Sequence, residues 1–144
     1  MEFIYKLLEW TPKVLPVLAK SAVVTLEVTA GSLIIALVLG IIVALARISR
    51  FKIISYPALI YTDLMRGTPA LVQLFIIYFG LSDLGIEFEP KIAAIIGLGL
   101  NGAAYVGEIY RAGIKAIHKG QMESALSVGM TPFGAMRYII FPQA

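Results

Sequence analysis

Three polar residues lie at helical spacing within an otherwise apolar stretch of the sequence. Asn101, Tyr105 and Glu108 stand at positions i, i+4 and i+7, so that a helix carries them on one narrow stripe. Ionisable side chains inside an apolar helix are costly and often mark the path of a solute or ion. One interpretation is therefore that the stripe lines a solute path. A second is that it bonds to neighbouring helices, with Glu108 reaching water near the helix end.

Another pair of ionisable residues precedes a helix break. Asp63 and Arg66 lie one helical turn apart and are followed by Gly67-Thr68-Pro69. Thr68 is a good N-cap and Pro69 suits the first helical position, so the pattern predicts a helix that restarts within the apolar stretch. Its free N–H groups, together with Arg66, would attract an anionic group such as a carboxylate. The alternative is an Asp63–Arg66 ion pair that neutralises itself.

The composition places these groups in a membrane. Of 144 residues, 59% are hydrophobic and only 15% are charged, whereas soluble domains carry about 25% charged residues. Residues 28–46 hold no charge, and this length is close to the ~20 residues that cross a bilayer core. The chain has no cysteine and a single histidine, His118. We therefore expect no disulfide, no metal site and no cofactor bound by this chain.

The apolar segments predict an all-α membrane protein with the fold of a polytopic helical bundle. We expect spans over residues 22–46, 53–81 (interrupted) and 92–114, and a fourth span that begins near residue 133 and is cut off at residue 144.

Two further patterns concern how these spans are flanked and packed. Gly99, Ala103 and Gly107 form a ridge of small residues on the far side of the third span from the polar stripe, where another helix can approach closely. Residues 1–20 mix apolar with charged side chains. They predict either an amphipathic segment on the membrane surface or an ordinary polar lead-in to the first span.

The charges of the connections predict how the spans are oriented. Residues 47–52 carry three cations and no acid, residues 82–90 carry three acids and no cation, and residues 111–119 carry three cations. Because Lys and Arg concentrate on the cytoplasmic side, the first and third connections face the cytoplasm. The N-terminus and the second connection then face outside.

The segment after the third span predicts a short cytoplasmic helix over about residues 120–130. Lys119-Gly120 ends the span, Gly129 is a typical helix stop, and Thr131-Pro132 starts the next helix. Apolar and small residues recur on one face, whereas the opposite face carries no Lys or Arg. This pattern favours docking on a partner over binding to a lipid surface.

This cytoplasmic segment resembles the conserved loop of ABC importer permeases. Glu123-Ser124-Ala125, three residues, Gly129, nine residues, Ile139, one residue and Phe141-Pro142 follow the family pattern Glu-Ala-Ala, three residues, Gly, nine residues, Ile, one residue, Leu-Pro. Ser124 and Phe141 depart from it without altering charge or helix geometry. The Arg66-Gly67-Thr68-Pro69 stretch resembles permeases for polar amino acids, and residues 105–121 resemble the exit of their third span.

The resemblance implies a type I ABC importer transmembrane domain over residues 21–144, with its C-terminal spans beyond this sequence. It implies a multi-pass protein of the bacterial inner membrane that is not itself an enzyme and has no catalytic residues. The expected partners are a second permease subunit (identical or related), an ABC ATPase that holds ATP and Mg, and an extracytoplasmic solute-binding protein. The residues expected to couple to the ATPase are Gln121, Met122, Glu123, Ser124, Ala125, Leu126 and Gly129.

The expected cargo is a polar amino acid, moved by alternating access. Candidate substrate-binding residues are Asp63, Arg66, Asn101, Tyr105 and Glu108. The acids Asp63 and Glu108 favour a basic side chain (arginine, lysine or histidine), and Arg66 or the half-helix start would take the α-carboxylate. Glutamine or glutamate is the alternative cargo. An ATP-independent secondary transporter or a passive scaffold subunit would explain the spans, but not the spacing of the cytoplasmic motif.

Overall fold

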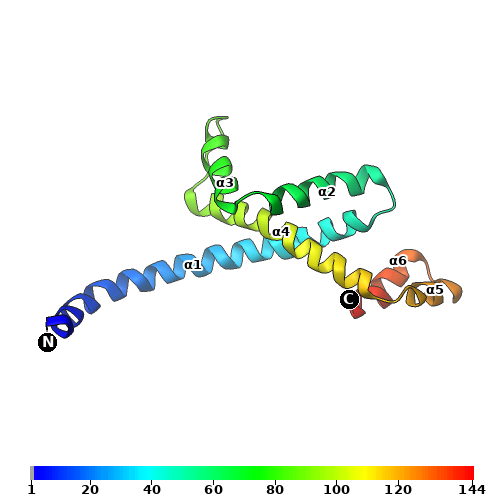
Figure 1. Cartoon of the computed structure of the whole chain (residues 1–144), viewed down its shortest axis with the longest axis horizontal. Coiled ribbons are helices and arrows are strands. Elements are labelled where there is room, and N and C mark those ends of the chain that lie inside the picture. Colours follow the sequence, from blue (N-terminus) through cyan, green and yellow to red (C-terminus); the bar gives the residue numbers. More distant parts are fainter. Residues whose placement is uncertain (1) are drawn as a thin grey trace.

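The computed structural model describes the backbone of residues 2–144 and the side chains of residues 11–144, and its regular elements are all helices. Figure 1 shows two long helices, α1 (Glu2–Ile48) and α4 (Pro90–Ala116), that cross near the middle of the molecule, with shorter helices at the two ends of α4. In chain order the helices are α1 (Glu2–Ile48), α2 (Lys52–Gly67), α3 (Ala70–Phe75), the π-helix η1 (Ile76–Gly80), α4 (Pro90–Ala116), α5 (Lys119–Ser127), α6 (Pro132–Ala135), the π-helix η2 (Met136–Ile140) and α7 (Phe141–Gln143).

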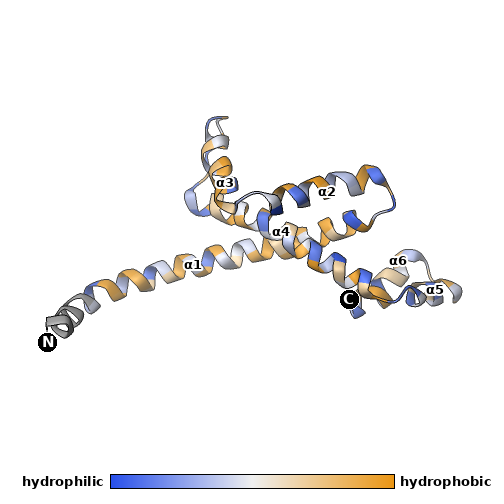
Figure 2. Ribbon diagram, in the orientation of Figure 1, coloured by the Kyte–Doolittle hydropathy of each residue, from blue (hydrophilic) through white to orange (hydrophobic). Residues whose placement is uncertain are grey.

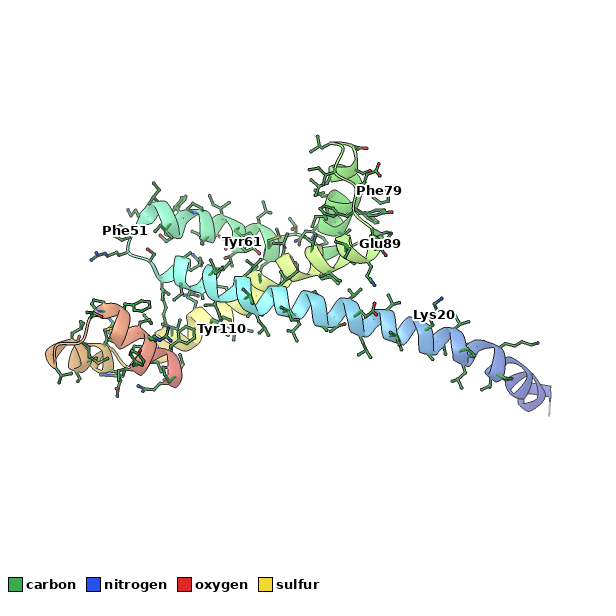
Figure 3. The ribbon with its side chains drawn as sticks, turned by 180° about the vertical axis from the view of Figure 1, so that it is seen from behind. Lys20, Phe51, Tyr61, Phe79, Glu89 and Tyr110 are labelled. Carbon is green, nitrogen blue, oxygen red and sulfur yellow. The ribbon has the colours of Figure 1, made fainter. Side chains whose placement is uncertain are left out.

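Helix α1 is the longest element and extends well beyond the others. Its half around Lys20 projects away from the remaining helices (Figures 1 and 3). The helix runs through residue 20 without a break, so the first span and the lead-in form one rod. The amphipathic surface segment predicted for residues 1–20 stays a prediction, since the side chains of residues 1–10 lie outside the described ones.

Two of the described helices are long and apolar enough to cross a membrane, Thr11–Ile48 and Pro90–Ala116. They correspond to the first and third predicted spans. The second predicted span is divided between α2, with 16 residues, and a shorter apolar helical stretch over Ala70–Gly80. Figure 1 shows α3 turned steeply away from α2, so the chain changes direction at this division.

The small residues of α4 form the contact with α1, as the sequence predicts. A Cβ atom added to Gly99 would lie 2.7 Å from Cβ of Ile35, and one added to Gly107 would lie 2.9 Å from Cγ1 of Val43. Ala103, between them, is fully buried. Any larger residue on this ridge would push the helices apart, so the ridge is what allows the two long helices to pack closely.

The break between α2 and α3 forms where it was predicted, but its cap differs from the prediction. Pro69 occupies the N-cap position of α3, which begins at Ala70 and has no side-chain cap. The hydroxyl of Thr68 donates instead to the carbonyl of Leu64, 2.8 Å away. The prediction that Thr68 caps α3 and that Pro69 is its first helical residue is therefore wrong. A threonine hydroxyl can bond to the carbonyl four residues earlier, and this bond forms here in place of the predicted cap.

The short helix after α4 begins one residue earlier than predicted. Helix α4 ends at Ala116, and the ring of His118 caps α5 by accepting a hydrogen bond from the Gly120 amide at 3.1 Å. Lys119 and Gly120 thus form the first turn of α5. The prediction that they end the preceding span is therefore wrong.

The end of α5 matches the predicted stop at Gly129. This residue has φ +85°, a conformation that costs side-chain-bearing residues about 1–2 kcal/mol. The amide of Met130 donates to the carbonyl of Ala125 at 3.1 Å, and that of Gly129 to Leu126 at 3.0 Å. This is a Schellman motif, which closes the helix and redirects the chain. As predicted, Thr131 then caps α6.

Candidate functional site

A carboxylate on α4 is surrounded by guanidinium groups from three helices. Oε1 of Glu108 accepts from Nε of Arg47 on α1 at 3.2 Å, and Oε2 accepts from Nη2 of Arg111 on α4 at 2.7 Å. Nη1 of Arg66, on α2, lies 3.9 Å from the same Oε2. The Glu108 side chain is only 15% exposed. Three cations face one anion here, so the carboxylate is neutralised and the cluster retains an excess of positive charge.

The predicted alternative for Asp63 and Arg66, a mutual ion pair, does not form. Arg66 turns instead toward α4, where its Cζ lies 5.4 Å from the centre of the Tyr105 ring, a cation–π contact. Among the described side chains Asp63 has no ion pair, and it is exposed. The two charges therefore do not neutralise each other. Arg66 lies against Glu108 and Tyr105 of α4, and Asp63 faces outward without an ion pair among the described side chains.

The break between α2 and α3 is held by two amide side chains. Nε2 of Gln73 donates to the Met65 carbonyl at 2.9 Å and to Oγ1 of Thr68 at 2.7 Å. Nδ2 of Asn101 donates to the same Met65 carbonyl at 3.0 Å and to Oε1 of Gln73 at 3.1 Å. Backbone groups freed inside a membrane must find partners within the protein. These amides supply them and join the break to α4.

Gln73 is a functional candidate that the sequence analysis did not single out. Its side chain is 7% exposed, one of the few buried polar side chains described. The available signal was a lone glutamine in the apolar run from Leu71 to Gly80. A buried polar group in such a run requires hydrogen-bond partners, and the unpaired carbonyls at the preceding break are the nearest ones.

Four of the five predicted substrate-site residues, Arg66, Asn101, Tyr105 and Glu108, make contacts between α2 and α4. The fifth, Asp63, lies one helical turn before Arg66 on α2. Figure 2 shows hydrophilic residues interrupting the apolar surface where α2 meets α4. Asn101 and Glu108 are engaged with neighbouring helices, as in the second interpretation of the polar stripe. Asp63 and Tyr105 are exposed, and Arg66 is partly so, at 44%. Asp63 takes no part in the ion-pair network, whereas Arg66 and Tyr105 contact each other at its exposed edge.

The predicted coupling segment forms an exposed helix next to the start of the fourth span. Ala125 is buried and Met122 half-buried, whereas Gln121, Glu123, Ser124 and Leu126 are exposed. The buried side of α5 faces α6 and η2, and Figure 1 places these elements together at one end of α4. The helix therefore presents a polar face with one apolar residue, Leu126, beyond the membrane-spanning helices.

The sequence matches one family over most of its length. The model of the family "Binding-protein-dependent transport system inner membrane component" matches residues 36–144. The chain is 45% identical over 132 residues to ArtQ of Bacillus subtilis, an arginine transport system permease protein. It is 40% identical over 139 residues to the Rickettsia bellii protein GlnP, named for a glutamine transport system.

A solved structure shares the arrangement of these helices. The crystal structure of an amino acid ABC transporter with histidines matches with a TM-score of 0.83 and 41% identity, over 92% of this chain and 62% of that one. The match to ArtQ covers 90% of this chain and 60% of ArtQ, and the match to GlnP 96% and 63%. The chain thus spans about three fifths of the length of the curated relatives it matches.

Proposed function

Because this chain belongs to the family of binding-protein-dependent transport system inner membrane components, we propose that it forms membrane-spanning helices of an ATP-driven importer of amino acids. Permeases of this family do not hydrolyse ATP themselves, since a separate ATPase subunit does so. The importer includes that ATPase, an extracytoplasmic solute-binding protein and a second permease subunit. The first and third connections face the cytoplasm, as the distribution of Lys and Arg favours.

The exposed helix α5 is the observation that carries this proposal. It places Glu123 and the Gly129 turn, at the spacing of the permease loop motif, beyond the ends of the spans. The Schellman turn and the Thr131 cap fix its direction relative to the next helix. A short helix held in this way can dock in a groove of the ATPase and move with it as a rigid unit while the spans alternate between outward- and inward-open states.

Two variants of the coupling segment test the proposal in the complete importer reconstituted in liposomes. Glu123→Arg reverses an exposed charge, and Gly129→Asp strains the turn. Both should uncouple ATP hydrolysis, stimulated by loaded binding protein, from amino-acid uptake, while membrane insertion persists. Lys115→Gln, which alters an exposed residue in the last turn of α4, is the control. Normal transport by both coupling variants would contradict the proposal, and failure of the chain to co-purify with an ATPase would favour a secondary transporter.

We propose a basic amino acid as cargo, bound near Asp63, Arg66, Asn101, Tyr105 and Glu108. Glu108 is already paired with arginines, so of the two acids among these five candidates the exposed Asp63 is the one that can meet a cationic side chain. Arg66, beside Tyr105, would meet the α-carboxylate. The similarity to ArtQ supports a basic cargo, and the similarity to GlnP supports glutamine or glutamate as the second candidate.

The variant Asp63→Asn separates the two cargo classes. Uptake of arginine, lysine and histidine should fall at least about ten-fold, the effect of losing about 1.4 kcal/mol of a charge-assisted contact. Uptake of glutamine should change little. Because ATP coupling is measured on the same preparation, a wrong cargo assignment and a wrong importer assignment give different results. An equal loss for both amino-acid classes would remove Asp63 from the substrate site.

A further inference from the structure

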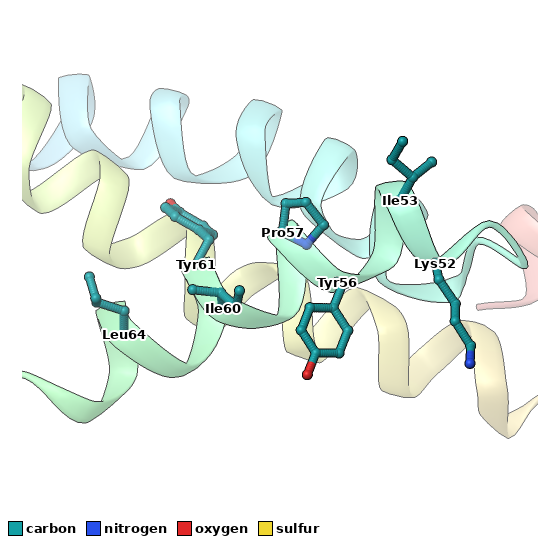
Figure 4. A pocket seen from close by; sticks show the side chains of 7 residues that line it. All are labelled: Lys52, Ile53, Tyr56, Pro57, Ile60, Tyr61 and Leu64. Atoms are coloured by element: carbon teal, nitrogen blue, oxygen red, sulfur yellow. The ribbon is translucent and has the colours of Figure 1, made fainter.

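A groove runs along the outer side of α2 (Figure 4). Its volume is about 540 Å³. The residues that line it are Lys52, Ile53, Tyr56, Pro57, Ile60, Tyr61 and Leu64. Except for Lys52, they present hydrocarbon or aromatic rings, and none of them is acidic.

The groove has the length of one leaflet of a bilayer. From Ile53 to Leu64 the helix rises by roughly 17 Å at about 1.5 Å per residue. Half of a hydrocarbon core of ~30 Å is about 15 Å. Ile53 is 85% exposed and Ile60 is 55% exposed, so the described helices leave this surface open. A single acyl chain could lie along it over its full length.

The wall of the groove is fixed before any ligand binds. The hydroxyl of Tyr61 donates to the carbonyl of Leu100 on α4 at 2.6 Å, which holds the aromatic ring in place. Pro57 restricts the backbone at the middle of the groove, because its ring locks φ. A ligand that enters such a preformed groove loses less conformational freedom with it than it would with a mobile surface.

The two cations at the membrane-surface end of the groove are unpaired. Arg47, in the same connection, is neutralised by Glu108, but neither Arg50 nor Lys52 has an acidic partner among the described side chains. The Cζ atom of Arg50 lies 4.9 Å from the centre of the Phe51 ring, which holds the guanidinium near the start of α2. An uncompensated positive charge at the end of an apolar groove matches a ligand with an anionic head and an apolar tail.

We propose that this groove is a binding site for an anionic phospholipid. One acyl chain lies along Ile53, Ile60 and Leu64, and the headgroup phosphate is bound by Lys52 and Arg50. Basic surfaces between membrane helices bind anionic headgroups in this way, and each Lys or Arg near the surface contributes about 1 kcal/mol. The site goes beyond the proposed transport function and does not depend on the identity of the cargo.

Photo-crosslinking tests the site in the complete importer. A benzophenone amino acid replaces Ile60 in the groove or, as the matched control, Val38 on α1, which is 56% exposed. The importer is placed in nanodiscs of phosphatidylglycerol and phosphatidylethanolamine in known proportion, and the crosslinked lipid is identified by mass spectrometry. We expect phosphatidylglycerol at position 60 to exceed its bulk proportion by about five-fold or more, since one cation contributes about that factor. At position 38 the crosslinked lipid should match the bulk.

Charge variants decide whether the cations cause this enrichment. The double variant Arg50→Gln/Lys52→Gln should abolish it, whereas Lys115→Gln should leave it unchanged. Both altered residues are exposed and unpaired, so folding should be unaffected. If the lipid crosslinked at position 60 has the same proportions as the nanodisc, the groove holds only ordinary boundary lipid, and the proposal is overturned. Crosslinking of position 60 to protein, whether another copy or another subunit, would also overturn it.

Discussion

Nε of Arg47, in the last turn of α1, donates to Oε1 of Glu108 on α4 at 3.2 Å, across 61 positions of the sequence. The same carboxylate accepts from Arg111 one turn further along α4. Glu108 therefore joins the ends of the two longest helices. The arrangement makes this residue part of the framework that joins the helices, whereas Asp63 has no ion pair among the described side chains.

The first prediction concerns this shared carboxylate. Glu108→Gln leaves the half-buried Arg47 and Arg111 without their counter-charge, so the free energy of unfolding should fall by about 1–3 kcal/mol, less than for a fully buried pair. Reversible unfolding of the purified protein in mixed micelles measures the change. The control Glu87→Gln alters an exposed acid in the second connection and should stay within about 0.5 kcal/mol of the parent. Equal stability of the two variants would show that Glu108 does not hold the helices together.

The second prediction concerns the amide pair at the break. Gln73→Leu removes the donors to Met65 and Thr68 and should destabilise the protein by about 1–3 kcal/mol, because buried carbonyls lose their partners. Asn101→Leu should do the same. The double variant should lose less than the sum, with a coupling of about 0.5 kcal/mol or more, since both amides serve one network. Additive losses in the unfolding measurements would mean that the two side chains act independently.

The third prediction concerns the α1–α4 contact. Gly99→Ala places a Cβ atom 2.7 Å from Cβ of Ile35, so the helices must shift, at a cost of about 1–3 kcal/mol. Gly67→Ala is the matched control, because a Cβ atom there meets nothing within 4 Å. A lower melting temperature for the first variant alone is the expected result. If both variants have the melting temperature of the parent protein, the close approach at Gly99 does not contribute to stability.

The fourth prediction concerns the end of α5. Gly129→Ala forces a side chain into φ +85° and should weaken the turn by about 1–2 kcal/mol. Hydrogen exchange of the Met130 amide, which donates to Ala125, should speed up by about five-fold to thirty-fold. Gly129→Asn should show a smaller effect, since asparagine adopts this conformation more readily. Unchanged exchange in the alanine variant would show that the turn does not depend on glycine.

Sequence reasoning located the elements well, because local rules govern them. The apolar runs, the break near residues 67–69, the short helix α5 and the Gly129 stop all follow from periodicity, chain stiffness and positive φ. Errors arose where two local solutions compete. Thr68 could cap α3 or bond back to α2. Gly120 could end one helix or, with His118 as its cap, lie in the first turn of the next. Spacing alone does not rank such alternatives.

The candidate site was predicted less completely than the helices. The polar stripe of α4 and the charges of α2 were identified as residue types in unusual surroundings. Their partners depend on how the helices cross. An ion pair with Asp63 is one of the two alternatives that the sequence leaves open for Arg66, but in the structure Arg66 lies near Glu108 and Tyr105. Gln73 escaped notice because its partners are backbone carbonyls, which no residue type reveals.

The sequence by itself determined the class of protein and the family to which it belongs. An apolar composition requires a lipid environment, and the motif from Glu123 to Pro142 lies within one local segment whose spacing alone identifies it. The tertiary structure decided which charges are free. Ion pairs and amide networks join residues dozens of positions apart, and their geometry depends on the close packing of α1 and α4 at Gly99 and Gly107. For that reason Glu108 belongs to the framework of the bundle, whereas Asp63 is exposed and has no ion pair among the described side chains.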